Sequence, residues 1–113
     1  MFSKGLYIND VAVTEIAIPE GITVIKGHTF AYCLNLTEIT LPQSLTTIEN
    51  LAFNHCEALQ EISIPKNVNS IGLGNFTKSP NLKAAYFYGN VPEVWLGNVF
   101  DVLSEDLVIY YRY

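Results

Sequence analysis

ITLPQSLTTIENLAFNHCEALQE, residues 39–61, follows directly on IAIPEGITVIKGHTFAYCLNLTE (16–38) and is continued without a gap by ISIPKNVNSIGLGNFTKSPNLKA (62–84). A fixed period of 23 residues indicates one supersecondary unit stacked on copies of itself. In such a stack, equivalent apolar positions form columns that run from one copy to the next. The sequence therefore predicts a solenoid built from repeats.

Eight positions keep their character through the three copies. Seven are isoleucine, leucine, valine, proline or phenylalanine positions, and the eighth holds cysteine or serine. The columns are Ile16, Ile39 and Ile62; Ile18, Leu41 and Ile64; Pro19, Pro42 and Pro65; Ile22, Leu45 and Val68; Ile25, Ile48 and Ile71; Phe30, Phe53 and Phe76; Cys33, Cys56 and Ser79; and Leu36, Leu59 and Leu82. Their agreement makes the repeat specific.

Each copy predicts a short strand that ends at proline. The stretch from Leu36 to Leu41 ends in alternating apolar and polar residues, and Pro42 bounds it. Successive strands are expected side by side, about 4.8 Å apart, as a parallel sheet on one face of a right-handed coil. On the other face, GITVI (21–25) predicts a second short strand, and HTFAYC (28–33) suits a helical or 3₁₀ turn. The expected fold class is an α/β repeat solenoid that is mostly β.

The repeat consensus resembles a known family. The pattern L-x-x-I-x-I-P-x-x-V-x-x-I-x-x-x-A-F-x-x-C-x-x-L is similar to the BspA type of leucine-rich repeat, with Ala52, Phe53 and Cys56 supplying A-F-x-x-C. The resemblance covers nearly the whole chain. It implies a leucine-rich-repeat fold, an extracellular or cell-surface setting in a microbe, and adhesion or host-protein binding.

One domain is expected, and its two ends differ from the repeats. GLYIND followed by VAVTE resembles a hairpin at the start of such an array. Near the other end, Tyr88 stands where proline is expected, and Phe100 falls one residue late for the phenylalanine column. The expected organisation is a single domain over 1–113, divided into a hairpin or partial rung (1–15), full repeats (16–38, 39–61 and 62–84) and an altered terminal rung with a cap (85–113).

Aromatic residues gather near the C-terminus. They are Tyr86, Phe87, Tyr88, Trp95, Phe100, Tyr110, Tyr111 and Tyr113. We expect them to cap the final rung, because an uncovered end leaves apolar columns and strand edges open. A platform for a sugar or a peptide is the alternative. At the N-terminal end, Ile16 and Ile18 have less cover, so end-to-end self-association is a further expectation.

Composition excludes several classes of protein. The formal net charge of −5 argues against binding DNA or RNA. No apolar run is long enough to span a bilayer, and the start MFSKGLYIND lacks the apolar stretch of a secretory signal. The surface setting that the family resemblance implies therefore requires an export signal outside this sequence.

No catalytic residue, metal site or cofactor is expected. Cys33 and Cys56 lie one rung apart, a separation that a disulfide spans, but we expect two buried thiols instead. His28 and His55 occupy different columns and are expected at the surface, and the chain lacks the paired spacings of a zinc site. No phosphate-binding glycine loop or nucleophile motif is present.

The outward residues of the strands form the candidate binding surface. Glu15, Glu38 and Glu61 are expected to stack in a ladder on one accessible face. Neighbouring carboxylates repel by only about 1 kcal/mol per pair in water, so an ordinary solvated face explains the ladder equally well. The candidate partner-binding residues are Thr14, Glu15, Thr37, Glu38, Thr40, Gln60, Glu61, Ser63, Lys83 and Tyr86.

These observations lead to two functional hypotheses. The first is a non-enzymatic protein-interaction module that binds a basic protein segment through the strand face, with a glycan or calcium as less favoured ligands. The second is a structural spacer in a larger repeat array, with no binding activity of its own.

Overall fold

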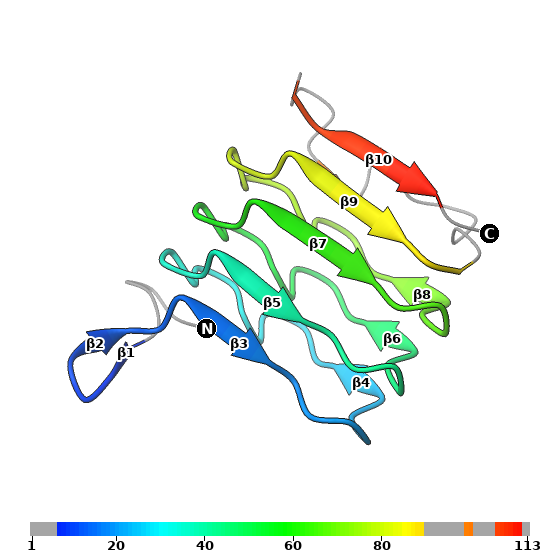
Figure 1. Cartoon of the computed structure of the whole chain (residues 1–113), viewed down its shortest axis with the longest axis horizontal. Helices are drawn as coiled ribbons and strands as arrows, with labels where there is room; N and C mark the ends of the chain where they lie inside the picture. The colour runs from blue at the N-terminus through cyan, green and yellow to red at the C-terminus, as the bar shows by residue number, and fades with distance from the viewer. Residues whose placement is uncertain (1–6, 90–98, 101–105, 112–113) are drawn as a thin grey trace.

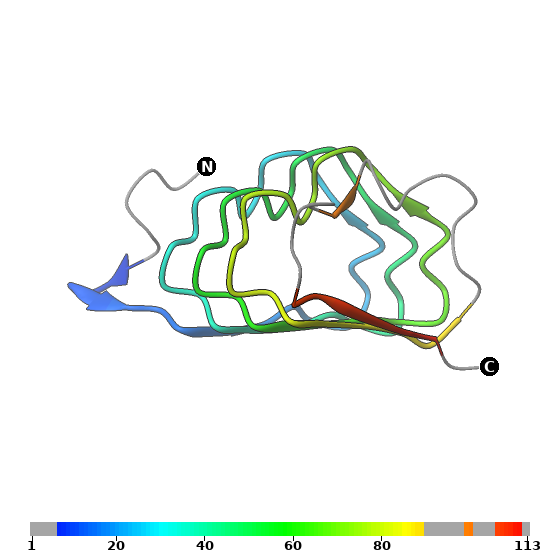
Figure 2. The same cartoon turned by 90° about the horizontal axis from the view of Figure 1, so that it is seen from above.

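The computed structural model describes residues 7–89, 99–100 and 106–111 and shows a parallel-stranded solenoid (Figure 1). Each of the first three rungs contributes one strand to the front of the coil and a shorter one to the back, and seen from above these rungs follow similar outlines, each offset from the one before (Figure 2). The solenoid that the 23-residue period predicts is confirmed.

The front of the solenoid carries the longer strands. They are β3 (Glu15–Ala17), β5 (Glu38–Thr40), β7 (Glu61–Ile64), β9 (Ala84–Phe87) and β10 (Val108–Tyr111). On the back, β4 (Val24–Ile25), β6 (Thr47–Ile48) and β8 (Ser70–Ile71) form one parallel sheet. The described rung strands pair in parallel. Isoleucine is opposite isoleucine between β3 and β5 and in the back sheet, as in Ile16 with Ile39, whereas in β9 Ala85 takes this position opposite Ile62.

A small hairpin precedes the first rung. Strands β1 (Tyr7–Ile8) and β2 (Val11–Ala12) pair antiparallel. The turn between them places Asn9 and Asp10 at φ angles of 51° and 64°. These two residue types adopt the left-handed conformation more readily than most, which is why a two-residue turn forms here.

The returns between front and back are hydrogen-bonded turns, where the sequence suggested a helical or 3₁₀ turn. Bonds such as Ala31 N–H to the His28 carbonyl have the i to i+3 spacing of a 3₁₀ turn. In each of the first three rungs, two positions of these turns have a positive φ angle, the left-handed conformation. A right-handed helix cannot continue through such a residue, so the turns stay short. The columns are His28, Leu51 and Gly74, and Tyr32, His55 and Lys78.

The apolar columns pack into one core along the coil. Leu36, at the end of the first repeat, and Leu45, Ile48 and Leu59 of the second have no exposed surface. The phenylalanine column is a stack of rings, with centroid distances of 5.5, 5.6 and 5.3 Å along Phe30, Phe53, Phe76 and Phe100. Repetition of one residue type at one position therefore places like side chains face to face.

The last rung is one residue longer than the others. Strand β10 pairs with β9 at a spacing of 24 residues, as Val108 with Ala84, whereas β7 and β9 pair at 23, as Glu61 with Ala84. The same extra residue brings Phe100 opposite Phe76. The late position of Phe100 in the sequence thus reflects a longer rung, and the ring still joins its column.

The first rung is less covered than those that follow. Ile22 is 41% exposed, while its column partners Leu45 and Val68 are 0% and 3% exposed. Ile16, Ile18 and Phe30 are only partly buried. These side chains line an apolar groove of about 410 Å³ at the N-terminal end of the coil.

Candidate interaction surface

The outward side chains of β3, β5, β7, β9 and β10 form one surface, here called the strand face (Figure 1). In β5, Ile39 points into the core while Glu38 and Thr40 are exposed, as strand alternation requires. The polar residues that the sequence placed between the core positions therefore share this face.

Six of the ten candidate residues lie on the front strands, and Thr14, Thr37, Gln60 and Lys83 directly precede these strands. Most are exposed, and Thr37 and Tyr86 are half-buried. The Thr37 hydroxyl donates a hydrogen bond to the Thr14 carbonyl at 3.0 Å, so it links two rungs. The exposed members are Thr14, Glu15, Glu38, Thr40, Gln60, Glu61, Ser63 and Lys83.

The acidic ladder covers three rungs. Glu15 and Glu38 are direct partners in the register of β3 and β5, and Glu61 holds the equivalent position in β7. Glu61 is opposite Ala84, so the ladder ends there. The strand face is therefore acidic toward its N-terminal end.

Toward the C-terminal end the strand face becomes aromatic. Tyr86 is opposite Ser63 in the register, and its ring stacks on Tyr110 with centroids 4.9 Å apart. Burial, followed by the nearby negative charge of Glu61, raises the pKa of Tyr86 above its usual value. Tyr86 is therefore a neutral hydrogen-bonding side chain at physiological pH.

The remaining aromatic residues divide between the core and the surface. Phe87 is buried and packs against Phe100 and Tyr111, whereas Tyr111 itself is 40% exposed. Trp95 and Tyr113 lie outside the described residues.

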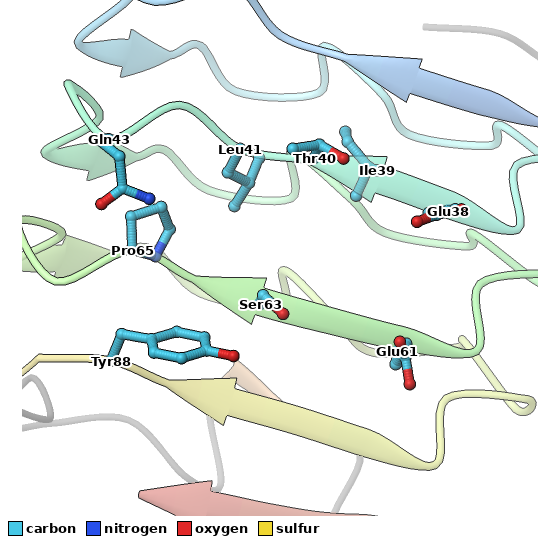
Figure 3. A pocket seen from close by; sticks show the side chains of 9 residues that line it. All are labelled: Glu38, Ile39, Thr40, Leu41, Gln43, Glu61, Ser63, Pro65 and Tyr88. Carbon is cyan, nitrogen blue, oxygen red and sulfur yellow. The ribbon is translucent and has the colours of Figure 1, made fainter. Parts of the chain in front are cut away.

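The front of the solenoid opens between β5 and β7. Strand β5 pairs with β3, and β7 pairs with β9, but β5 and β7 belong to different sheets. A cleft of about 200 Å³ lies there, which we call the Tyr88 cleft (Figure 3). It is lined by Glu38, Ile39, Thr40, Leu41, Gln43, Glu61, Ser63, Pro65 and Tyr88.

The sequence identified only part of this cleft. Glu38, Thr40, Glu61 and Ser63 were candidate residues, whereas Tyr88 was noted only as a departure from the proline column. That departure is the one sequence signal that points to the cleft, since a ring replaces the small proline at its edge.

The cysteines and histidines do not form a reactive centre. Cys33 and Cys56 are free and buried, and burial raises their pKa values to about 11 and about 12. His55 stacks on Tyr32 at 4.3 Å and its Nδ1 lies 2.6 Å from Asn54 Oδ1. Among residues 7–89, 99–100 and 106–111, no three histidine, cysteine or acidic side chains gather as metal ligands would.

A coil of stacked repeats with one exposed strand face is the architecture of leucine-rich-repeat proteins. The model of the BspA type leucine-rich repeat region, with 6 copies, matches residues 2–100. The chain belongs to this family. No curated protein matches it.

Three solved structures are similar to this chain. A leucine-rich cell surface protein of Faecalibacterium prausnitzii is 33% identical with a TM-score of 0.68, covering 74% of this chain and 22% of its own. A leucine-rich repeat protein of Eubacterium ventriosum is 38% identical with a TM-score of 0.68, and the match covers 75% of this chain and 23% of that protein. The pneumococcal vaccine antigen PcpA is 36% identical with a TM-score of 0.66, and the match covers 72% of this chain and 20% of that protein. This chain thus corresponds to about a fifth of each.

In the described residues, 7–89, 99–100 and 106–111, no helix is long and apolar enough to cross a bilayer.

Proposed function

We propose that this repeat module binds another protein through its strand face, as part of a microbial cell-surface or secreted protein. The observation that carries the proposal is the row of exposed polar side chains, with Glu15, Glu38 and Glu61 in successive rungs of one face. A rigid surface of this kind binds with little loss of conformational entropy, because packing in the core already orders its strands.

The setting and the class of partner rest on the similar proteins and on charge. Two of the similar structures are a cell surface protein and a vaccine antigen, which supports a location at the cell surface. The net charge of −5 favours a basic partner surface, since complementary charge speeds encounter and selects among partners. Adhesion to a host protein is the biological role that we propose for this contact, and the module performs no catalysis in it.

A glycan is the second candidate ligand. The stacked rings of Tyr86 and Tyr110 favour it, because aromatic faces pack against the apolar faces of sugars. Binding of this kind would centre on β9 and β10, away from the acidic ladder.

An array of immobilised matrix proteins, host-cell surface proteins and glycans tests the proposal. We expect selective capture of the unmodified chain by one or more proteins, and its loss in the Glu15→Lys/Glu38→Lys/Glu61→Lys variant. The matched control is Asp10→Lys/Glu57→Lys/Asp106→Lys, which changes the net charge equally at three other exposed acidic residues.

Three results would count against the proposal. Equal loss in both variants would show that net charge alone drives capture. Capture by glycans alone would favour the aromatic end of the strand face. No capture by any component would favour a structural spacer in a longer array, a role that suits a chain matching about a fifth of each solved relative.

A further inference from the structure

We propose that the Tyr88 cleft is the anchor point of the strand face and receives an arginine or lysine side chain from a basic segment of the partner. This inference rests on the proposed function and adds to it the place and chemistry of the central contact.

The cleft is a local opening in an otherwise continuous stack. On the back of the solenoid β4, β6 and β8 form an unbroken sheet, and the phenylalanine stack passes through the same rungs at regular spacing. On the front, β5 and β7 lie next to each other but are not hydrogen-bonded partners in one sheet. The space there is of the size that one long side chain requires, and is smaller than a usual pocket for a drug-sized molecule.

The two ends of the cleft differ in chemistry. Figure 3 shows Glu38 and Glu61 near the beginnings of their strands, and Tyr88, Gln43 and Pro65 near the strand ends. An arginine or lysine side chain has matching parts, a cationic head for the carboxylates and an apolar stem for Pro65 and the Tyr88 ring. In an alternative pose, the cation lies over the Tyr88 ring, an attractive contact in its own right.

Charge excludes the opposite kind of ligand. The residues that line the cleft include two carboxylates and no lysine or arginine. The two carboxylates would repel an anionic group, whereas a guanidinium can bond two carboxylate oxygens at once.

The test is an NMR titration of the ¹⁵N-labelled chain with acetyl-Gly-Arg-Gly-amide. We expect shifts centred on β5, β7 and Tyr88, and none with the matched citrulline peptide, which has nearly the same shape without the charge. Glu61→Gln and Tyr88→Ala should each weaken binding about tenfold, the loss expected for one charge-assisted or cation–π contact. Tyr88→Phe should retain it.

Glu57→Gln is the control, because Glu57 is exposed and lies outside the cleft. Equal shifts from the citrulline peptide, or equal weakening by Glu57→Gln, would overturn the inference. The spectrum of each variant reports whether it is folded.

The array separates this inference from the proposed function. If proteins are captured through the acidic ladder but Tyr88→Ala and Glu61→Gln leave capture unchanged, strand-face binding stands and the cleft is not its anchor. If the arginine peptide binds the cleft but the array captures no protein, the cleft is a cation site and the adhesive function fails.

Discussion

Individual polar residues tie each rung to the next. Asn50 Oδ1 accepts a hydrogen bond from the Leu73 N–H at 2.8 Å, and Ser44 Oγ accepts one from the Gly21 N–H at 2.9 Å. The Glu20 carboxylate likewise accepts a hydrogen bond from the Gln43 N–H. These contacts join residues about one repeat apart, so they satisfy backbone groups at the turns, where no strand pairing does so.

Gly72 shows how closely the rungs approach. A Cβ at this position would collide with Oδ1 and the backbone N of Asn50. We predict that Gly72→Ala lowers the free energy of unfolding by about 1–3 kcal/mol, the usual cost of overpacking. Urea denaturation measures it. Leu73→Ala is the control, because Leu73 is 57% exposed, and an equal effect of the two substitutions would contradict the account.

The buried thiols predict a loss of stability at alkaline pH. Burial raises the pKa values of Cys33 and Cys56 from 9.0 to about 11 and about 12. Between pH 9 and the raised pKa of each thiol, the unfolded chain has lost a thiol proton that the folded chain retains. The contribution of the thiols to the free energy of unfolding is therefore fully present below about pH 9 and is lost as the pH rises toward about 12. Denaturation from pH 7 to 11 measures the slope.

A variant without the two thiols isolates their contribution to this decline. Cys33→Ala/Cys56→Ala should show a smaller decline over that range than the unmodified chain. Identical slopes would mean that the thiols are not buried as described.

At the scale of elements, the phenylalanine stack joins the turns of adjacent rungs. Phe53 has no exposed surface and lies between Phe30 and Phe76, with ring planes within 8° of parallel on both sides. Phe30 has a ring neighbour on one side only among the described residues and is half-buried.

Removing rings from this stack should have unequal costs. We predict that Phe53→Ala destabilises the chain by about 3–5 kcal/mol, as expected for a large cavity in a packed core. Phe30→Ala should cost clearly less. Thermal and urea denaturation of both variants measure the difference, and equal losses would show that the core does not run along the stack.

The sequence predicted the front strands because alternation and proline mark them directly, as from Leu36 to Pro42. It did not predict the left-handed turn columns. Leu51 and Tyr32 are residue types that rarely adopt φ angles near 60°, so only packing between rungs explains their conformation. The opening between β5 and β7 was also missed, because the repeat pattern is the same on both sides of it.

For the candidate site, sequence and structure each supplied part. Period and alternation identified which side chains face outward, including Glu38 and Glu61. A flat ladder was the expected shape, whereas a cleft with Tyr88 at its edge is what the structure shows. A cleft depends on spacing between strands, which no pattern within one strand encodes.

At the scale of the whole molecule, stability should vary along the solenoid. The second rung has a neighbour on both sides, while the first rung exposes part of its apolar columns. Repeat arrays gain much of their stability from such nearest-neighbour contacts. We predict slower native-state hydrogen exchange for amides of 39–61 than for those of 16–38, and equal protection would indicate that the first rung is covered.

The charge distribution makes the strand face the distinctive surface of the molecule. Three carboxylates stand in successive rungs there, and the cleft between β5 and β7 opens on the same side (Figure 3). We propose that the molecule binds its partner through this face.

The dissociation constant of the best-captured protein tests this claim most directly. It should be measured for the unmodified chain, for Glu15→Lys/Glu38→Lys/Glu61→Lys, and for the control Asp10→Lys/Glu57→Lys/Asp106→Lys. The account predicts binding weakened by at least about tenfold in the strand-face variant and little changed in the control, because each reversed charge removes an attraction and adds a repulsion. Equal dissociation constants for the two folded variants would contradict it.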